Sequence, residues 1–368
     1  MARPACRLGG VDEVHGAERA LVGALVLEPA RLGEVSGWLR PEDFDLPVCG
    51  LVYRRLLDLR QGAGRVDPAG LVGLLRGRGE LRRDGYPIVQ VSGMFDGVPV
   101  PARLPVYAGV VVGGALARQV SAAGRRLEQA CREGRDSGRL LAAAAAQRAA
   151  LAGAQRRWRA LPAAGVLKGG PPVISGRGSG PVRLPGPGSA APADELATVG
   201  GLLLAPGLVA GVGCWLAPAD FIDPGCRLAF DRIGQLTARG MPVDRVMLAA
   251  DSTWRDGAGR AGQLNVLLAR AQAAVSTAGS TGFYARRVLA ASAGRQVLGA
   301  ARELVALGEQ RRGGPDTVLA LGLAALDALD GVRRQTRLAA GPPRTRADAA
   351  GRGPGLTRPP AGRCRPVG

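Results

Sequence analysis

The stretch Trp38-Leu39-Arg40-Pro41-Glu42-Asp43-Phe44 occurs twice in this chain. Its second copy is Trp215-Leu216-Ala217-Pro218-Ala219-Asp220-Phe221. The offset between the two tryptophans also relates further pairs on both sides: Leu25-Val26-Leu27 with Leu202-Leu203-Leu204, Tyr53 with Phe230, Val66-Asp67 with Val243-Asp244, Tyr107 with Tyr284, and Arg118-Gln119-Val120 with Arg295-Gln296-Val297. One register held this long indicates an internal duplication. Because solenoid repeats have about 20 to 50 residues, each copy is predicted to be a whole domain.

The apolar residues of each copy recur at helical spacing, which predicts an all-α fold. A small helical lobe comes first, and its helices are expected at 17–27, 29–39 and 47–61, with a fourth capped by Asp67. A helix over 104–133, which Gly134 ends, and a second over 139–158, which Asp136 or Ser137 caps, then form an αα-hairpin. The second copy repeats the pattern with a clear short helix over 262–270, and Asp316-Thr317 caps a helix over 318–329.

The long helix of each hairpin carries an apolar stripe that is a candidate interface. The stripe residues that we assign to it are Val106, Val110, Val120 and Leu127 in the first copy and Phe283, Val297 and Leu304 in the second. Two arrangements remain open at this point. The stripe packs within its own hairpin, or it packs against the other copy or another chain. In the second case the chain forms an intrachain pseudo-dimer or a homo-oligomer.

Composition divides the rest of the chain. We predict a flexible arm over 1–16, the first domain over 17–158, a Pro/Gly/Ser-rich flexible linker over 159–193, the second domain over 194–335, and a disordered Arg-rich tail over 336–368. The net charge is +19, and nine arginines against one aspartate lie from Arg333 to the end. The tail is either a solvated, compositionally biased end or a set of phosphate contacts, and the candidate contacts are Arg344, Arg346, Arg352, Arg358, Arg363 and Arg365.

The chemistry-bearing residues favour structural roles. His15, the sole histidine, lies in the predicted arm and is interpreted as exposed and inert rather than as a base. Trp38 and Trp215 are interpreted as core residues rather than base-stacking platforms, and Asp43 and Asp220 as turn caps rather than catalytic acids. The sequence shows no CxxC pair and no cluster of metal ligands, so neither a metal nor a cofactor is expected.

Three further features concern the compartment. No apolar run is as long as a membrane span, which needs about 18 residues. The N-terminus lacks the apolar core of a signal peptide. Cys49 and Cys226 stand at equivalent helical positions, which is typical of buried free thiols in a reducing compartment. We therefore expect a cytoplasmic protein, with association with the nucleoid as a variant of that expectation.

The order of these motifs resembles the N-terminal domain of the DnaB-type bacterial replicative helicase, present twice. The residues that carry the resemblance are the Trp-Leu-x-Pro-x-Asp-Phe stretch, the aromatic at Tyr53 or Phe230, the Val-Asp helix start, the Asp-Gly turns Asp84-Gly85 and Asp256-Gly257, and Tyr107-Ala108 or Tyr284-Ala285 at the hairpin. The resemblance covers about 17–158 and 194–335. It implies a helical lobe and hairpin, hairpins that pair between subunits, and a collar that binds primase.

The sequence lacks the nucleotide-binding motif on which the motor of such a helicase depends. A P-loop needs G-x-x-x-x-G-K-[ST], yet Lys168 is the only lysine and Gly169 follows it. The sequence therefore predicts a non-enzymatic, DNA-replication-associated interaction protein with the replicative helicase or primase as its partner. Two alternatives stay open: a non-specific nucleic-acid-binding protein acting through its arginine-rich tail, and a split or decayed helicase fragment.

Overall fold

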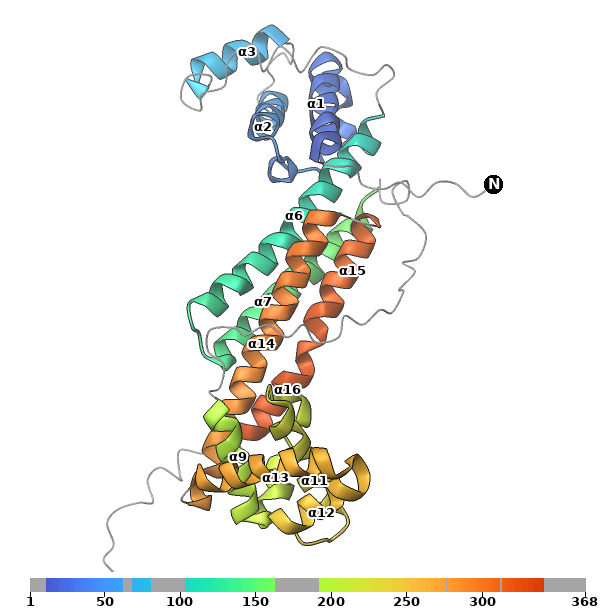
Figure 1. The fold of residues 1–368 in the computed structure, drawn as a ribbon. Helices are drawn as coiled ribbons and strands as arrows, with labels where there is room; N and C mark the ends of the chain where they lie inside the picture. The colour runs from blue at the N-terminus through green and yellow to red at the C-terminus, as the bar shows by residue number, and fades with distance from the viewer. Residues whose placement is uncertain are drawn as a thin grey trace, which may run out of the picture.

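The computed structural model describes residues 11–61, 68–80, 103–162, 192–275, 277–311 and 313–340, and all regular elements within these ranges are helical. This confirms the predicted all-α class. Figure 1 shows an elongated molecule with a lobe at each end and long helices bundled between them. The first copy supplies the upper lobe and one hairpin, and the second copy supplies the lower lobe and the other hairpin.

The first copy begins with lobe 1 and continues into hairpin 1. The helices of lobe 1 are α1 (Val11–Leu27), the 3-10 turns η1 (Pro29–Glu34) and η2 (Pro41–Asp43), α2 (Pro47–Gln61) and α3 (Pro68–Gly77). Hairpin 1 consists of α6 (Leu104–Arg132) and α7 (Ser137–Ala160). Asp136 caps α7, because its Oδ1 accepts a hydrogen bond from the Arg139 backbone N–H at 2.9 Å.

The second copy has the same order with more short elements. Lobe 2 contains α9 (Pro192–Leu204), η3 (Pro206–Leu208), α10 (Val209–Gly213), η4 (Pro218–Asp220), α11 (Pro224–Ala238), α12 (Arg245–Asp256), α13 (Ala258–Ala273) and η5 (Ala278–Ser280). Hairpin 2 consists of α14 (Thr281–Gln310), α15 (Gly314–Asp327) and α16 (Leu329–Ala340).

The first helix begins earlier than the sequence pattern predicts. Residues 11–16 belong to α1, although we expected an arm up to residue 16. The physical reason is Val14, which is fully buried against α6, where Gly114 leaves room for it. A Cβ on Gly114 would lie 2.9 Å from Val14 Cγ1. The apolar face of α1 therefore extends one turn further back than the run that starts at Ala17.

The predicted helix over 29–39 is wrong in kind. Only Pro29–Glu34 is helical, as a 3-10 turn, and the chain then turns so that the Leu39 N–H donates to the Val35 carbonyl at 2.9 Å. Gly33 and Gly37 weaken an α-helix here. Pro41 also requires an extended residue before it. Arg40 is extended, with φ −121° and ψ 150°.

Hairpin 2 also departs from the prediction. Asp316-Thr317 does not begin its second helix. The helix starts two residues earlier, at Gly314. Gly313 precedes it with φ 82°, and Gly314 itself has φ 84°. Glycine adopts these positive φ angles without strain. The helix breaks at Ala328 and continues as α16 to Ala340, so residues 336–340, assigned to the tail, are helical. The helix expected over 262–270 is α13 and is longer at both ends.

Several sequence-based interpretations lie outside the described residues. These are the Asp84-Gly85 turn, the linker from residue 163 to 191, and the tail from residue 341 onward, including Arg344, Arg346, Arg352, Arg358, Arg363 and Arg365. They remain predictions.

One apolar cluster runs from lobe 1 through the bundle and contains residues of both hairpins, while a second cluster fills lobe 2. Helix α6 contributes residues to the first cluster along most of its length, and this burial explains why so many of its residues are apolar. It is the single described helix that alone meets a length and hydropathy criterion for a membrane span, and 67% of the qualifying window is buried inside the protein. Packing in the bundle accounts for that composition.

Candidate interaction site

The two hairpins cross where α6 meets α14. A Cβ on Gly124 would lie only 2.4 Å from the Ala301 carbonyl oxygen, and a Cβ on Gly308 would lie 2.5 Å from the Ala117 carbonyl oxygen. Position 124 therefore faces 301 while 117 faces 308, so the helices run antiparallel (Figure 1). Small residues allow the two backbones to approach closely, and larger side chains at Gly124 and Gly308 would separate them.

The crossing relates equivalent positions of the duplication. Ala301 is the counterpart of Gly124 in the second copy, because the two are separated by the same number of residues as Trp38 and Trp215. A residue that contacts its own counterpart lies next to a two-fold axis, as in an isologous dimer. The hairpins of this chain thus pair with approximate two-fold symmetry within one molecule.

The structure divides the seven predicted stripe residues into two groups. Val120, Leu127, Val297 and Leu304 are buried in one cluster that contains both hairpins. Val106 and Val110 are half-buried, and Phe283 is 53% exposed.

The antiparallel register explains the second group. Gly308 faces Ala117 close to the C-terminus of α14, so Val106 and Val110 lie beyond the end of that helix. Phe283 occupies the corresponding place near the start of α14. Its ring instead packs edge-on against Tyr284, with the Arg287 guanidinium 5.7 Å from the ring centre.

Exposed ion pairs lie along the edges of this bundle. Arg125 Nη1 is 3.2 Å from Glu309 Oε1, and Arg148 pairs with Asp327. Both pairs join the two hairpins, but exposed pairs each contribute about 0–1 kcal/mol. The apolar core, and not these charges, holds the hairpins together.

Each lobe is fastened to its hairpin by a repeated polar network. Asp43 is buried, and its Oδ2 accepts from the Arg40 N–H at 2.8 Å; Asp220 accepts from the Ala217 N–H in the same way at 2.8 Å. The carbonyl of Asp43 accepts from Arg118 at 2.6 Å, and that of Asp220 from Arg295 at 2.5 Å. The turn-cap role predicted for the two aspartates agrees with this geometry.

The aromatic residues of the repeated stretch belong to the core. Phe44 packs at a tilt against Tyr53 with 5.3 Å between ring centres, and Phe221 packs in the same way against Phe230 at 5.0 Å. Trp38 and Trp215 are half-buried and pack against these clusters. The Trp38 indole N–H donates to the Glu34 carbonyl at 3.0 Å.

One buried pair escaped the sequence analysis. Glu18 and Glu195 are buried at the same position of the two copies. Each carboxylate accepts two backbone N–H bonds, at 2.6 and 2.8 Å from Asp45 and Leu46, and at 2.8 and 2.9 Å from Ile222 and Asp223. Burial raises the pKa of Glu18, against the lowering effect of its backbone hydrogen bonds. The sequence did contain a signal for this pair: a glutamate stands at the same position of both copies, within a helix that is otherwise mostly apolar.

His15 differs from its predicted state. It lies in α1, is half-buried, and its Nε2 is 3.0 Å from Asp45 Oδ2. The interpretation as an exposed arm residue was wrong because α1 starts at Val11. The contact ties α1 to the chain just after Phe44 and supplies no nucleophile. Within the described residues, no group of three or more His, Cys, Asp or Glu side chains is arranged to hold a metal.

Cys49 and Cys226 are free and buried, as predicted. Burial raises the pKa of Cys49 to about 12 and also raises the pKa of Cys226. Both side chains therefore stay protonated thiols, which are poor nucleophiles.

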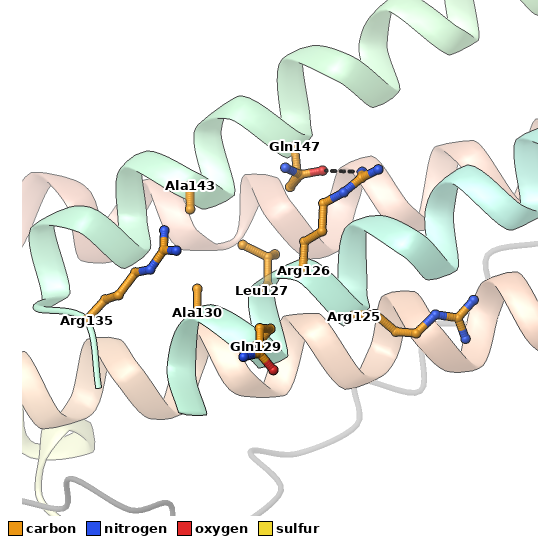
Figure 2. A pocket seen from close by; sticks show the side chains of 8 residues that line it. All are labelled: Arg125, Arg126, Leu127, Gln129, Ala130, Arg135, Ala143 and Gln147. Carbon is orange, nitrogen blue, oxygen red and sulfur yellow. Dashed lines mark hydrogen bonds between the residues drawn. The ribbon is translucent and has the colours of Figure 1, made fainter. Parts of the chain in front are cut away.

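A pocket of about 480 Å³ opens between α6 and α7 (Figure 2). Its floor is apolar, and its arginines have partners: Arg125 bonds Glu309, Arg126 donates to Gln147, and Arg135 pairs with Glu133. Its lining contains no carboxylate, thiol or histidine. The pocket therefore offers no catalytic chemistry. Its lining residues are Arg125, Arg126, Leu127, Gln129, Ala130, Arg135, Ala143 and Gln147.

Comparisons with known proteins agree with the duplication. The family description "DnaB-like helicase N terminal domain" matches residues 12–112 and again 190–290. The replicative DNA helicase DnaB of Mycobacterium leprae (strain TN) is 36% identical over 117 residues, which are 31% of this chain and 18% of that protein. The chain thus matches less than a fifth of the length of that curated relative.

Among solved structures, the N-terminal domain of DnaB helicase from Mycobacterium tuberculosis is 30% identical. The match covers 39% of this chain and 94% of that domain, with a TM-score of 0.30. Because the two family matches together include more than half of the residues, this chain belongs to the family of DnaB-like helicase N-terminal domains and carries that domain twice.

Proposed function

We propose that this chain is a non-catalytic interaction protein of DNA replication that docks on the replicative helicase or on primase through its lobes. The observation that carries the proposal is the close crossing of α6 and α14 at Gly124 and Ala301. In the helicase family that the sequence resembles, such hairpins pair between subunits. Here the pairing hairpin is supplied by the same chain, so its surface is already occupied.

Because the hairpins pair with each other, the lobes provide the surfaces that remain free to bind a partner. Leu27 and Leu204 stand at the same position of the two copies, and both are exposed at the C-terminal end of α1 and α9. A large apolar side chain exposed in both lobes is a feature of the repeat and not of one copy alone. Single exposed leucines are common on protein surfaces, so it is the recurrence in both copies that supports a shared contact position. A chain that presents two such lobes without a motor is suited to capping or loading a helicase.

The experiment measures binding to purified helicase and primase of the native host in about 0.15 M salt, where the Debye length is about 8 Å. The full chain is compared with a chain that ends at Ala340, the last residue of α16. We expect equal affinity for both, because the lobes and not the tail make the contact. Retained helical circular dichroism with no binding to either partner contradicts the proposal.

The matched variants place a charge on the lobes. Leu27→Glu combined with Leu204→Glu is expected to weaken binding about tenfold or more, which corresponds to about 1.4 kcal/mol. Leu338→Glu serves as the control, since Leu338 is a similarly exposed leucine on α16. If all three substitutions leave the affinity unchanged, the contact does not use this part of the lobes.

A further inference from the structure

Trp254 is the most exposed large apolar residue among the described ones, with 90% of its surface accessible. It lies on α12 in line with Val246, which is 76% exposed, and with the exposed Ala250. These residues are four apart, so they form one narrow stripe along the helix. In Figure 1, α12 lies at the lower end of the molecule, on the opposite side of the bundle from lobe 1.

The stripe belongs to the second copy alone. At the offset of the duplication, Val246 corresponds to Ala69 and Trp254 to Gly77 on α3. The helical scaffold therefore forms without a large side chain at either position. The exposed indole is an addition to lobe 2 that the fold does not require.

A surplus of positive charge surrounds Asp251 on the same helix. Asp251 is three residues before Trp254, so both project on the same side of α12. Two exposed arginines share its carboxylate, with Arg239 at 3.0 Å and Arg255 at 3.1 Å. One carboxylate neutralises one arginine, so Asp251 with Arg239 and Arg255 keeps a net positive charge, centred one helical turn before Trp254.

This combination matches the chemistry of a single nucleic-acid strand. Unpaired bases stack on an exposed aromatic ring, while arginines attract the neighbouring phosphates. A paired duplex offers no free base faces. A protein partner fits less well, because a stable protein interface buries about 800 Å² on each side. The stripe of Val246, Ala250 and Trp254 is too small to supply such an area.

We propose that Trp254 and the arginine cluster around Asp251 form a binding site for single-stranded nucleic acid on the outer face of lobe 2. The indole stacks on one base, and Arg239 and Arg255 contact the flanking phosphates. The site is independent of the helicase or primase contact proposed above, and it differs from tail contacts because it requires bases.

The test uses the full chain and three probes of about 12 nucleotides: oligo-dT, an abasic strand of equal charge, and a duplex. Trp158 is buried and Trp38 and Trp215 are half-buried, so stacking on Trp254 should quench the tryptophan fluorescence selectively. We expect quenching by oligo-dT, and weaker quenching by the abasic strand and the duplex. Any phosphate contacts of the arginine-rich tail are common to all three probes.

Three variants decide the outcome, and their affinities are measured by fluorescence anisotropy of end-labelled strands, because two of the variants lack the Trp254 indole. Trp254→Ala is expected to weaken oligo-dT binding about tenfold, in line with the loss of one stacked base, and to leave abasic binding unchanged. Trp254→Phe should retain most of the affinity. The control Phe283→Ala removes another exposed aromatic from the same half of the molecule and should change nothing.

Two results overturn the proposal. One is an oligo-dT affinity of Trp254→Ala equal to that of the unchanged protein; if this variant also loses binding to purified helicase or primase, the stripe is a protein contact. The other is an equal affinity of the unchanged protein for oligo-dT and for the abasic strand.

Discussion

Gly124 of α6 lies against Ala301 of α14, and the two residues occupy the same position in the two copies of the duplicated domain. A Cβ on Gly124 would be 2.4 Å from the Ala301 carbonyl oxygen, a separation that a real Cβ does not adopt. The hairpins of the two copies therefore approach each other at a point where only the smallest side chain fits.

Gly124→Ala should consequently destabilise the protein by about 1–3 kcal/mol, the usual cost of forcing an extra carbon into a packed core. Gly299→Ala is the matched control, because Gly299 lies on α14 with nothing within 4 Å of its added Cβ. That substitution should stabilise the protein by about 0.5–1 kcal/mol through helix propensity. Thermal unfolding measures both, and equal effects of the two variants would contradict the crossing.

The buried aspartates give a second paired comparison. Asp43 accepts from Arg157 at 2.8 and 2.5 Å, whereas the carboxylate of Asp220 accepts from Ser292 Oγ at 2.6 Å. Arg334, the counterpart of Arg157 in the second copy, lies on α16 and is not among the partners of Asp220. The two copies thus satisfy the same buried carboxylate with different partners.

Arg157→Ala removes the partner of a buried charge and should cost about 1–3 kcal/mol of unfolding free energy. Arg334→Ala should change that free energy by no more than about 0.5 kcal/mol, as is usual for a position away from such features. Urea denaturation of both variants tests this. A large effect of Arg334→Ala would mean that the second copy also relies on its arginine.

The duplication, the fold class and most long helices could be predicted from the sequence, because helical spacing is a local property. The helix over 47–61 was predicted with its observed bounds. The antiparallel crossing at Gly124 could not be predicted, since two equal stripes do not reveal which residues face each other. Trp254 was missed because helical spacing alone does not show whether the face that carries Val246 and Trp254 is buried or exposed. The start of α1 was missed because Val14 is buried by a distant helix, α6.

The ion pairs of Asp251 should make the stability of the fold depend on pH. Burial acts to raise the pKa of Asp251, but hydrogen bonds and charge from Arg239 and Arg255 outweigh it and hold the pKa below its ordinary value of 3.8. The folded state thus binds the proton less readily than the unfolded chain does. The stabilisation is complete above the ordinary pKa and is lost as pH falls through the lowered one.

The free energy of unfolding should therefore fall less for Asp251→Asn than for the unchanged protein when the pH decreases from about 5 to below the ordinary pKa of 3.8. Urea titrations at several pH values in this window give the difference. Parallel pH profiles for the two proteins would show that the arginine cluster does not couple to folding.

This chain should not bind or hydrolyse ATP. Its sequence contains no G-x-x-x-x-G-K-[ST], and the groups that hold nucleotide phosphates and magnesium in that motif therefore have no counterpart in it. Adding magnesium and ATP should leave the midpoint of thermal unfolding unchanged, because a ligand stabilises only the state that it binds. Magnesium-dependent phosphate release above a protein-free blank would contradict the prediction.

The last prediction concerns the covalent connection between the two copies. Among the described residues, one apolar core that contains Val120, Leu127, Val297 and Leu304 joins the two hairpins. A protease site placed between Gly169 and Gly180 lies in the part of the sequence rich in Pro, Gly and Ser. Cleavage there should leave the halves associated, and they should elute together on a sizing column at micromolar concentration. Combining the cleavage with Gly124→Ala should weaken the association, whereas combining it with Gly299→Ala should not. If the unsubstituted halves separate cleanly after cleavage, the hairpins are held together by the chain connection and not by the packing of α6 against α14.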